Sequence, residues 1–118
     1  MQVHNYEKLI VWQKAMDLVV FVYKVTEKFP KTEVYGITSQ IRRSVVSVPS
    51  NIAEGSRRKT KKDFAHFLVI ALGSISEFDT QIKISFRLGF ITQKEMEFLG
   101  DISLEIMKML NKLIESNC

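Results

Sequence analysis

Apolar residues recur at spacings of three and four along almost all of this 118-residue chain. That spacing is typical of a helix with one buried face, whereas a half-buried strand would alternate apolar and polar residues. Only five glycines and two prolines are available for turns, which disfavours a fold made of many short strands. The pattern therefore predicts an all-α protein built from a few long helices.

Turn and cap residues divide this pattern into four segments. Pro30 ends the first segment, and Gly89 suits the end of the third. Thr92 and Glu95 form a capping-box pattern before the last segment. Because the connections are short, we expect an up-down-up-down antiparallel four-helix bundle in a single domain, residues 1–118. The expected helices span about 7–28, 37–56, 61–88 and 93–116.

Pro49 lies inside the second helical segment. An internal proline removes a backbone hydrogen bond and costs roughly 3 kcal/mol. Either Pro49 begins a separate short helix, or it bends one long helix whose neighbouring serines relieve the strain. The apolar stripe keeps its phase through Pro49, which favours one bent helix.

A polar stripe on the second segment faces a polar stripe on the third if the two helices run antiparallel. Arg43 and Glu77 then lie within one helical turn of each other. Gly73, in the third segment near Glu77, suggests that the two helices approach each other closely there. A solvated face is the simpler reading of such charges. We nevertheless predict a partly buried ion pair between Arg43 and Glu77 that fixes register or assembly.

The positive charge of the chain is local. The net charge is +4, yet residues 42–62 contain seven cations and one anion, Glu54. Such a cluster can contact phosphates, so we predict a nucleic-acid-binding surface. Because no motif for contacting base edges is present, we expect this surface to recognise the backbone or the shape of the nucleic acid. A solubilising loop is the alternative, and Arg42 could serve a subunit contact instead. The predicted binding residues are Arg42, Arg57, Arg58, Lys59, Lys61 and Lys62.

Three apolar residues lie toward the polar side of the first helical segment: Ile10, Val20 and Phe21. Single apolar residues are normal on protein surfaces. Three together predict a contact between subunits, and hence a homo-oligomer.

No catalytic, metal or cofactor motif is visible, so we expect neither an enzyme nor a bound cofactor. A di-iron site in a helix bundle needs two Glu-x-x-His motifs. The most similar feature of this chain is a single Asp-x-x-His, formed by Asp63 and His66. Cys118 has no partner for a disulfide, and the N-terminus lacks a signal-peptide pattern, which together favour the cytoplasm. Membrane binding is not expected, because the apolar faces are needed for the core and no apolar run is long enough to span a bilayer.

Several motifs together carry a family resemblance: YEKL at 6–9, VWQKA at 11–15, YGITSQIRR at 35–43 and VPSNIAEG at 48–55. They resemble the bacterial four-helix-bundle proteins encoded in 23S ribosomal RNA intervening sequences, which are related to accessory proteins of diversity-generating retroelements. The resemblance implies a left-handed bundle that assembles into a ring, typically a homopentamer. It also implies RNA or DNA and a reverse transcriptase as partners. It implies no reaction.

Overall fold

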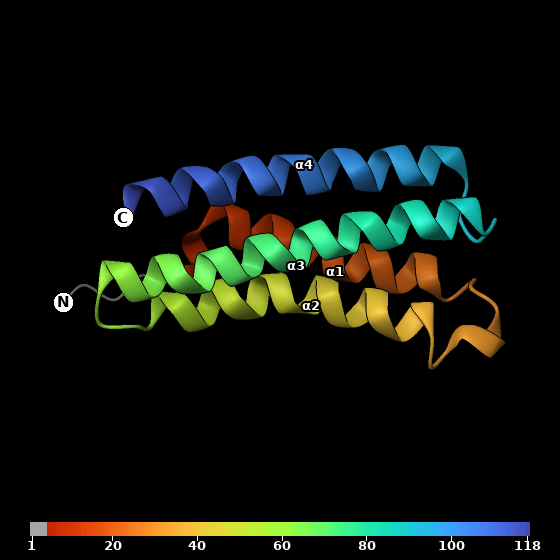
Figure 1. The fold of residues 1–118 in the computed structure, drawn as a ribbon, viewed down its shortest axis with the longest axis horizontal. Helices are drawn as coiled ribbons and strands as arrows, with labels where there is room; N and C mark the ends of the chain where they lie inside the picture. The colour runs from red at the N-terminus through yellow and green to blue at the C-terminus, as the bar shows by residue number, and fades with distance from the viewer. Residues whose placement is uncertain (1–4) are drawn as a thin grey trace.

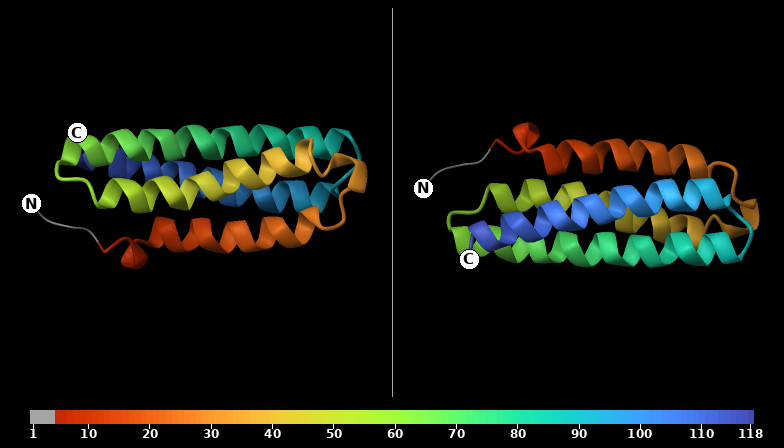
Figure 2. Two further views of the ribbon diagram at one scale, coloured as in Figure 1. Left: turned by 90° about the horizontal axis from the view of Figure 1, so that it is seen from below. Right: turned by 90° about the horizontal axis from the view of Figure 1, so that it is seen from above.

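The computed structural model describes residues 5–118, and the predicted all-α fold is confirmed in this part of the chain. The helices run up and down in chain order and form one elongated bundle (Figures 1 and 2). No strand occurs among the described residues. The elements are the 3₁₀ helix η1 (Tyr6–Lys8), α1 (Ile10–Thr26), the 3₁₀ helix η2 (Lys31–Glu33), α2 (Ile37–Ser56), α3 (Lys61–Arg87) and α4 (Gln93–Ser116).

The first helix is shorter than the sequence predicts. Residues 6–8 form a separate 3₁₀ turn, in which the amide of Glu7 donates to the side-chain oxygen of Asn5 at 3.2 Å. Leu9 then adopts an extended conformation, so α1 begins only at Ile10. The apolar spacing cannot show this break, because a 3₁₀ turn leaves the neighbouring apolar residues close to their helical spacing.

The predicted caps of α4 and α3 are present. Thr92 Oγ1 accepts from the amide of Glu95 at 3.0 Å, and the Glu95 carboxylate accepts from the amide of Thr92 at 2.9 Å. Gly89 has a φ of 80°, and the amide of the next residue, Phe90, donates to the carbonyl of Ser85 at 2.9 Å. A left-handed residue with this bond ends a helix and satisfies its last carbonyl groups, so α3 turns sharply into α4.

Pro49 lies within one uninterrupted α2, so the alternative of a separate helix starting there is wrong. The hydroxyl of Ser50 donates to the carbonyl of Val46 at 2.8 Å, and the amide of the Asn51 side chain donates to the carbonyl of Ser47 at 2.8 Å. These side chains add hydrogen bonds around the position where proline cannot donate one.

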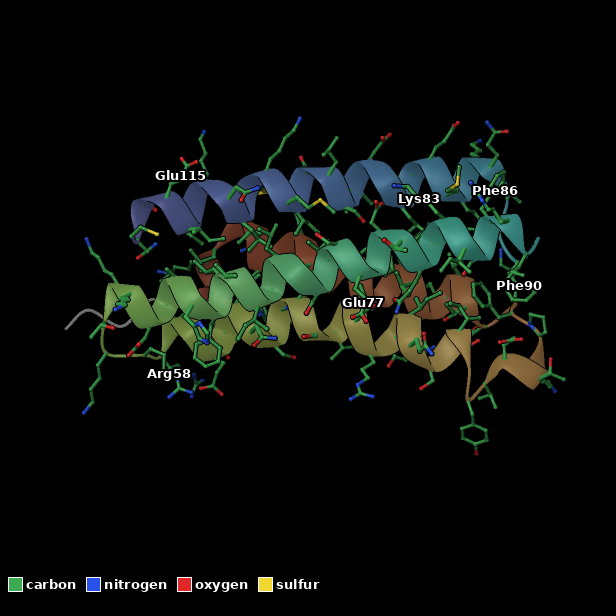
Figure 3. The ribbon with its side chains drawn as sticks, in the orientation of Figure 1. Arg58, Glu77, Lys83, Phe86, Phe90 and Glu115 are labelled. Atoms are coloured by element: carbon green, nitrogen blue, oxygen red, sulfur yellow. The ribbon has the colours of Figure 1, made fainter. Side chains whose placement is uncertain are left out.

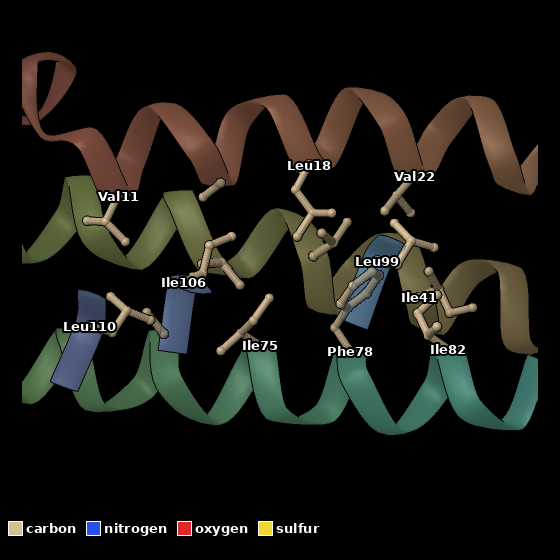
Figure 4. Packing of buried hydrophobic residues seen from close by; sticks show 14 of the residues in the cluster. Val11, Leu18, Val22, Ile41, Ile75, Phe78, Ile82, Leu99, Ile106 and Leu110 are labelled. Carbon is tan, nitrogen blue, oxygen red and sulfur yellow. The ribbon is translucent and has the colours of Figure 1, made fainter. Parts of the chain in front are cut away.

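All four helices contribute to one apolar core along the length of the bundle (Figure 4). Each helix packs against its two neighbours in the bundle, and the contact between α1 and α4 is the least extensive of these. Burial of these side chains is the main source of stability, at about 25 cal/mol for each Å² removed from water. Fully buried members include Leu18, Ile41, Ile75, Phe78, Leu99 and Ile106.

The seam between α2 and α3 contains small polar side chains in place of the predicted ion pair. The hydroxyl of Ser47 lies 2.9 Å from that of Ser74, and the hydroxyl of Ser44 donates to Gln81 Oε1 at 2.7 Å. Within the described chain, Arg43 and Glu77 are both exposed and form no salt bridge with each other. Short side chains fill the seam, so the long charged ones project into water and avoid the cost of desolvation.

Candidate nucleic-acid interface

The loop between α2 and α3, residues 57–60, lies at the end of the bundle where α4 also ends (Figure 1). Together with the first turn of α3 it carries five cations, all exposed: Arg57, Arg58, Lys59, Lys61 and Lys62. We call these five residues the loop cluster. The carboxylates nearby in sequence are Glu54 and Asp63, so residues 54–63 have a net charge of +3. The cluster is therefore a local source of positive potential.

The two arginines of the loop cluster are held by contacts within the chain. The guanidinium of Arg57 lies 5.5 Å from the centre of the Tyr6 ring, and that of Arg58 lies 4.7 Å from the centre of the Phe67 ring. Arg58 also forms a salt bridge with Glu54 at 3.2 Å, and Figure 3 shows it at this end of the bundle. Cation–π contacts at exposed sites contribute roughly 0.5–1 kcal/mol each, enough to order the side chains. The arginines shape the loop and keep part of their charge available.

The three lysines of the loop cluster have no such contacts. Within the described chain, Lys59, Lys61 and Lys62 are exposed and make no hydrogen bond or salt bridge through their ammonium groups. Lys61 and Lys62 occupy the first turn of α3, where the partial positive charge of the helix N-terminus adds to theirs. Unpaired, mobile ammonium groups can reach phosphates and release bound counterions without first breaking an internal contact.

Arg42, the sixth predicted binding residue, lies away from the loop cluster, and its role in binding stays a prediction. It lies fifteen positions before Arg57, the residue that follows α2, or about 22 Å along the helix axis. Its Nε donates to Thr26 Oγ1 at 2.9 Å, and its guanidinium lies 4.4 Å from the centre of the Tyr23 ring. Arg42 therefore joins α2 to α1 in the folded chain.

The predicted assembly residues on α1 divide into two kinds. Phe21 is half-buried and packs against Phe98 of α4, with the ring centres 4.9 Å apart, so the single chain already explains its apolar character. Ile10 and Val20 remain 59% and 54% exposed. The packing of the single chain does not cover these two side chains, so a subunit contact through them stays a prediction.

Tyr6 and Phe67 are site residues that the sequence does not reveal. Phe67 is nine positions from Arg58 across a turn, and Tyr6 is far from Arg57 in the chain. No periodicity links such pairs, because they meet only once the helices have packed. His66, whose ring centre lies 5.8 Å from that of Phe67, adds a further exposed ring beside the loop cluster.

Among residues 5–118, no group of three or more histidine, cysteine, aspartate or glutamate side chains is placed to hold a metal ion. Among the helices of these residues, none is long and apolar enough to cross a membrane.

Comparisons with known proteins agree with this fold. The family model described as "23S rRNA-intervening sequence protein" matches residues 7–112. A crystal structure from Bacteroides thetaiotaomicron VPI-5482, described as a protein with unknown function from the S23 ribosomal protein family, superposes with a TM-score of 0.81. The two sequences are 29% identical, and the match covers 90% of this chain and 96% of the other. No curated protein matches the chain.

Proposed function

The chain belongs to the 23S rRNA-intervening sequence protein family, and from this premise we propose that it is a non-enzymatic, oligomeric protein that binds the phosphate backbone of RNA or DNA through its loop cluster. The observation that carries the proposal is the set of three exposed lysines without intrachain partners, beside two ordered arginines. Lysine and arginine together supply the electrostatic, sequence-independent part of nucleic-acid binding.

Recognition by this surface follows shape and charge. A helix placed in a major groove would need side chains aimed at base edges, whereas the loop cluster offers flexible cations at the end of a bundle. The exposed ring of His66 beside Phe67 can stack on an unpaired base, which favours structured RNA with open loops over a regular duplex. We therefore expect weak sequence preference and steep dependence on salt concentration.

Self-association strengthens this binding. Each subunit of a ring would present one loop cluster, so weak contacts add through effective concentration. The exposed side chains of Ile10 and Val20 are apolar surface that association would remove from water. By resemblance to its family, we propose a pentamer, with five loop clusters on one assembly.

A second candidate is an oligomeric scaffold that binds a protein, for example a reverse transcriptase, and no nucleic acid. The exposed apolar surface of α1 also supports this alternative, since it suits a protein partner as well as a second copy. The two candidates differ in one respect, because only the first requires the loop lysines.

The deciding experiment measures binding of a hairpin RNA and a DNA duplex at about 50 mM salt by fluorescence anisotropy, with the particle mass determined by light scattering. We expect an oligomer that binds both, with the RNA bound more tightly. A well-formed oligomer that binds neither would overturn the first candidate and leave the scaffold. The variant Val20→Glu places charge on the apolar surface and should lower the particle mass, while Asp17→Glu, an exposed change on the same helix, should not.

A further inference from the structure

An open hollow of about 540 Å³ lies beside the start of α2, at the end of the bundle opposite the loop cluster. Figure 2 shows this end, where the turn between α1 and α2 meets the first turns of α2. We call it the tyrosine hollow. The side chains on which the argument depends are Tyr23, Tyr35, Thr38, Ser39, Arg42 and Arg43, all of which line it.

The apolar wall of the hollow is unusually exposed. Tyr35 is 95% exposed, although a tyrosine ring is a large, partly apolar group, and Val34 beside it is 49% exposed. Tyr23 and Val46 are 40% and 37% exposed. Burial of a large ring is favourable, and a flat ligand resting on Tyr35 would gain part of that free energy. Nothing else in the described chain covers this ring.

The charge of the hollow is positive. Arg42 is held over Tyr23 by the contacts described above, while Arg43 is exposed and forms no salt bridge with any described residue. No carboxylate lines the hollow. The nearest acid along the chain, Glu33, accepts from the backbone amide of Ile37 at 3.4 Å and so caps the start of α2. A ligand that fits this arrangement is anionic.

A buried hydroxyl without a partner marks the same place. Thr38, one of the lining residues, is 5% exposed, and its Oγ1 makes no hydrogen bond within the described chain. The other buried hydroxyls of α2 are bonded, Ser44 to Gln81 and Ser56 to a backbone carbonyl. Thr38 therefore adds, at the wall of the hollow, a polar group that the folded chain leaves unsatisfied.

From these features we propose that the tyrosine hollow is a nucleotide site, in which a base stacks on Tyr35 and the phosphate lies against Arg43. Guanidinium groups match phosphate geometry with two parallel hydrogen bonds, and aromatic rings stack on bases with little sequence preference. Ser39 is placed to add a hydroxyl donor, and the volume falls within the usual range for a small-ligand pocket. The ligand is either a free nucleoside phosphate or one nucleotide of a single strand. The site is independent of the loop cluster and extends the proposed function.

The test titrates the full chain with adenosine 5′-monophosphate, and separately with a six-nucleotide oligoadenylate, while amide chemical shifts are followed by NMR. We expect shifts centred on Tyr35, Ser39 and Arg43. The variants Tyr35→Leu and Arg43→Gln should each weaken binding about tenfold or more, which corresponds to about 1.4 kcal/mol. Binding of both ligands indicates a free nucleotide, and binding of the oligonucleotide alone indicates a single strand; each outcome supports the site.

The controls separate this site from the loop cluster and from simple charge effects. Arg87→Gln removes an exposed arginine at the same end of the bundle and should leave binding unchanged. The triple variant Lys59→Gln, Lys61→Gln, Lys62→Gln should also bind the nucleotide. Loss of binding in this variant would place the ligand at the loop cluster, which overturns the site in the hollow and leaves the proposed function standing. Binding that survives Tyr35→Leu, or no binding of either ligand by folded protein, overturns the proposal. So does a lower particle mass for Tyr35→Leu, because a second copy would then cover the ring.

Discussion

Replacing the three unpaired lysines of the loop cluster by glutamine tests the proposed function most directly. The variant Lys59→Gln, Lys61→Gln, Lys62→Gln removes three charges and no intrachain contact, since none of these ammonium groups has a partner in the described chain. Cations in the first turn of a helix oppose its macrodipole, so the variant should be as stable as the parent or slightly more stable. Any loss of binding then reports on phosphate contacts.

The expected magnitude follows from counterion release. Each phosphate neutralised on duplex DNA contributes about 0.9 to the slope of log affinity against log salt, so three contacts contribute about 2.7. Between 50 and 200 mM salt this difference amounts to roughly a 40-fold greater loss of affinity for the parent than for the variant, counted per subunit. Several subunits on one nucleic acid would increase it.

The assay is fluorescence anisotropy of a labelled duplex at four salt concentrations, with particle mass checked for each protein. The matched control is Lys24→Gln, Lys31→Gln, Lys94→Gln, which alters three exposed lysines at the opposite end of the bundle and leaves the same net charge of +1. The control should keep nearly the parent slope. Equal slopes of log affinity against log salt for all three proteins would refute local phosphate contact at the loop cluster. A slope reduced as much in the control as in the loop variant would refute it as well.

Three further predictions concern the fold. The hydrogen bond from the Thr92 amide, and then the bond from Lys28, hold the pKa of Glu95 below its ordinary value of 4.5. This stabilisation is present above pH 4.5 and is lost as the pH falls through the lowered pKa, so Glu95→Gln should destabilise the fold at pH 7 in urea unfolding, and the difference from the parent should shrink as the pH is lowered below 4.5. Gly73→Ala should raise the free energy of unfolding by about 1 kcal/mol, because helical glycine costs that much and the added Cβ meets no atom within 4 Å; no change, or a loss, would contradict this. Gly55→Ala should lower it by roughly 1–3 kcal/mol in the same assay, because its Cβ would lie 2.6 Å from a Cβ atom of α3.

Much of the fold was predictable because its determinants are local. The apolar stripes depend on residues three and four apart, and the cap formed by Thr92 and Glu95 depends on residues three apart. Gly89 could be assigned as a helix end for a similar reason, since few other residues adopt a positive φ easily. The continuous phase of the apolar stripe likewise predicted that Pro49 lies inside one helix.

The candidate site was predictable only as a position in the chain. The loop cluster stands out as a run of cations in the sequence, yet the sequence did not distinguish its ordered arginines from its unpaired lysines. It also could not show that Arg42, another predicted binding residue, is held against α1 in the other half of α2. The register that brings Arg43 and Glu77 nearly level was close to correct, but their side chains turn outward.

The sequence by itself determined which segments are helices and which faces form the core, because those features follow from backbone geometry and from the burial of many apolar groups. It did not determine where the first helix begins. Only the tertiary structure decided which charged and aromatic side chains meet. Such contacts join different helices and contribute about 1 kcal/mol or less each, so small differences in side-chain packing select among them. For the same reason the tyrosine hollow has no sequence signature: it exists only where the start of α2 lies beside the end of α1.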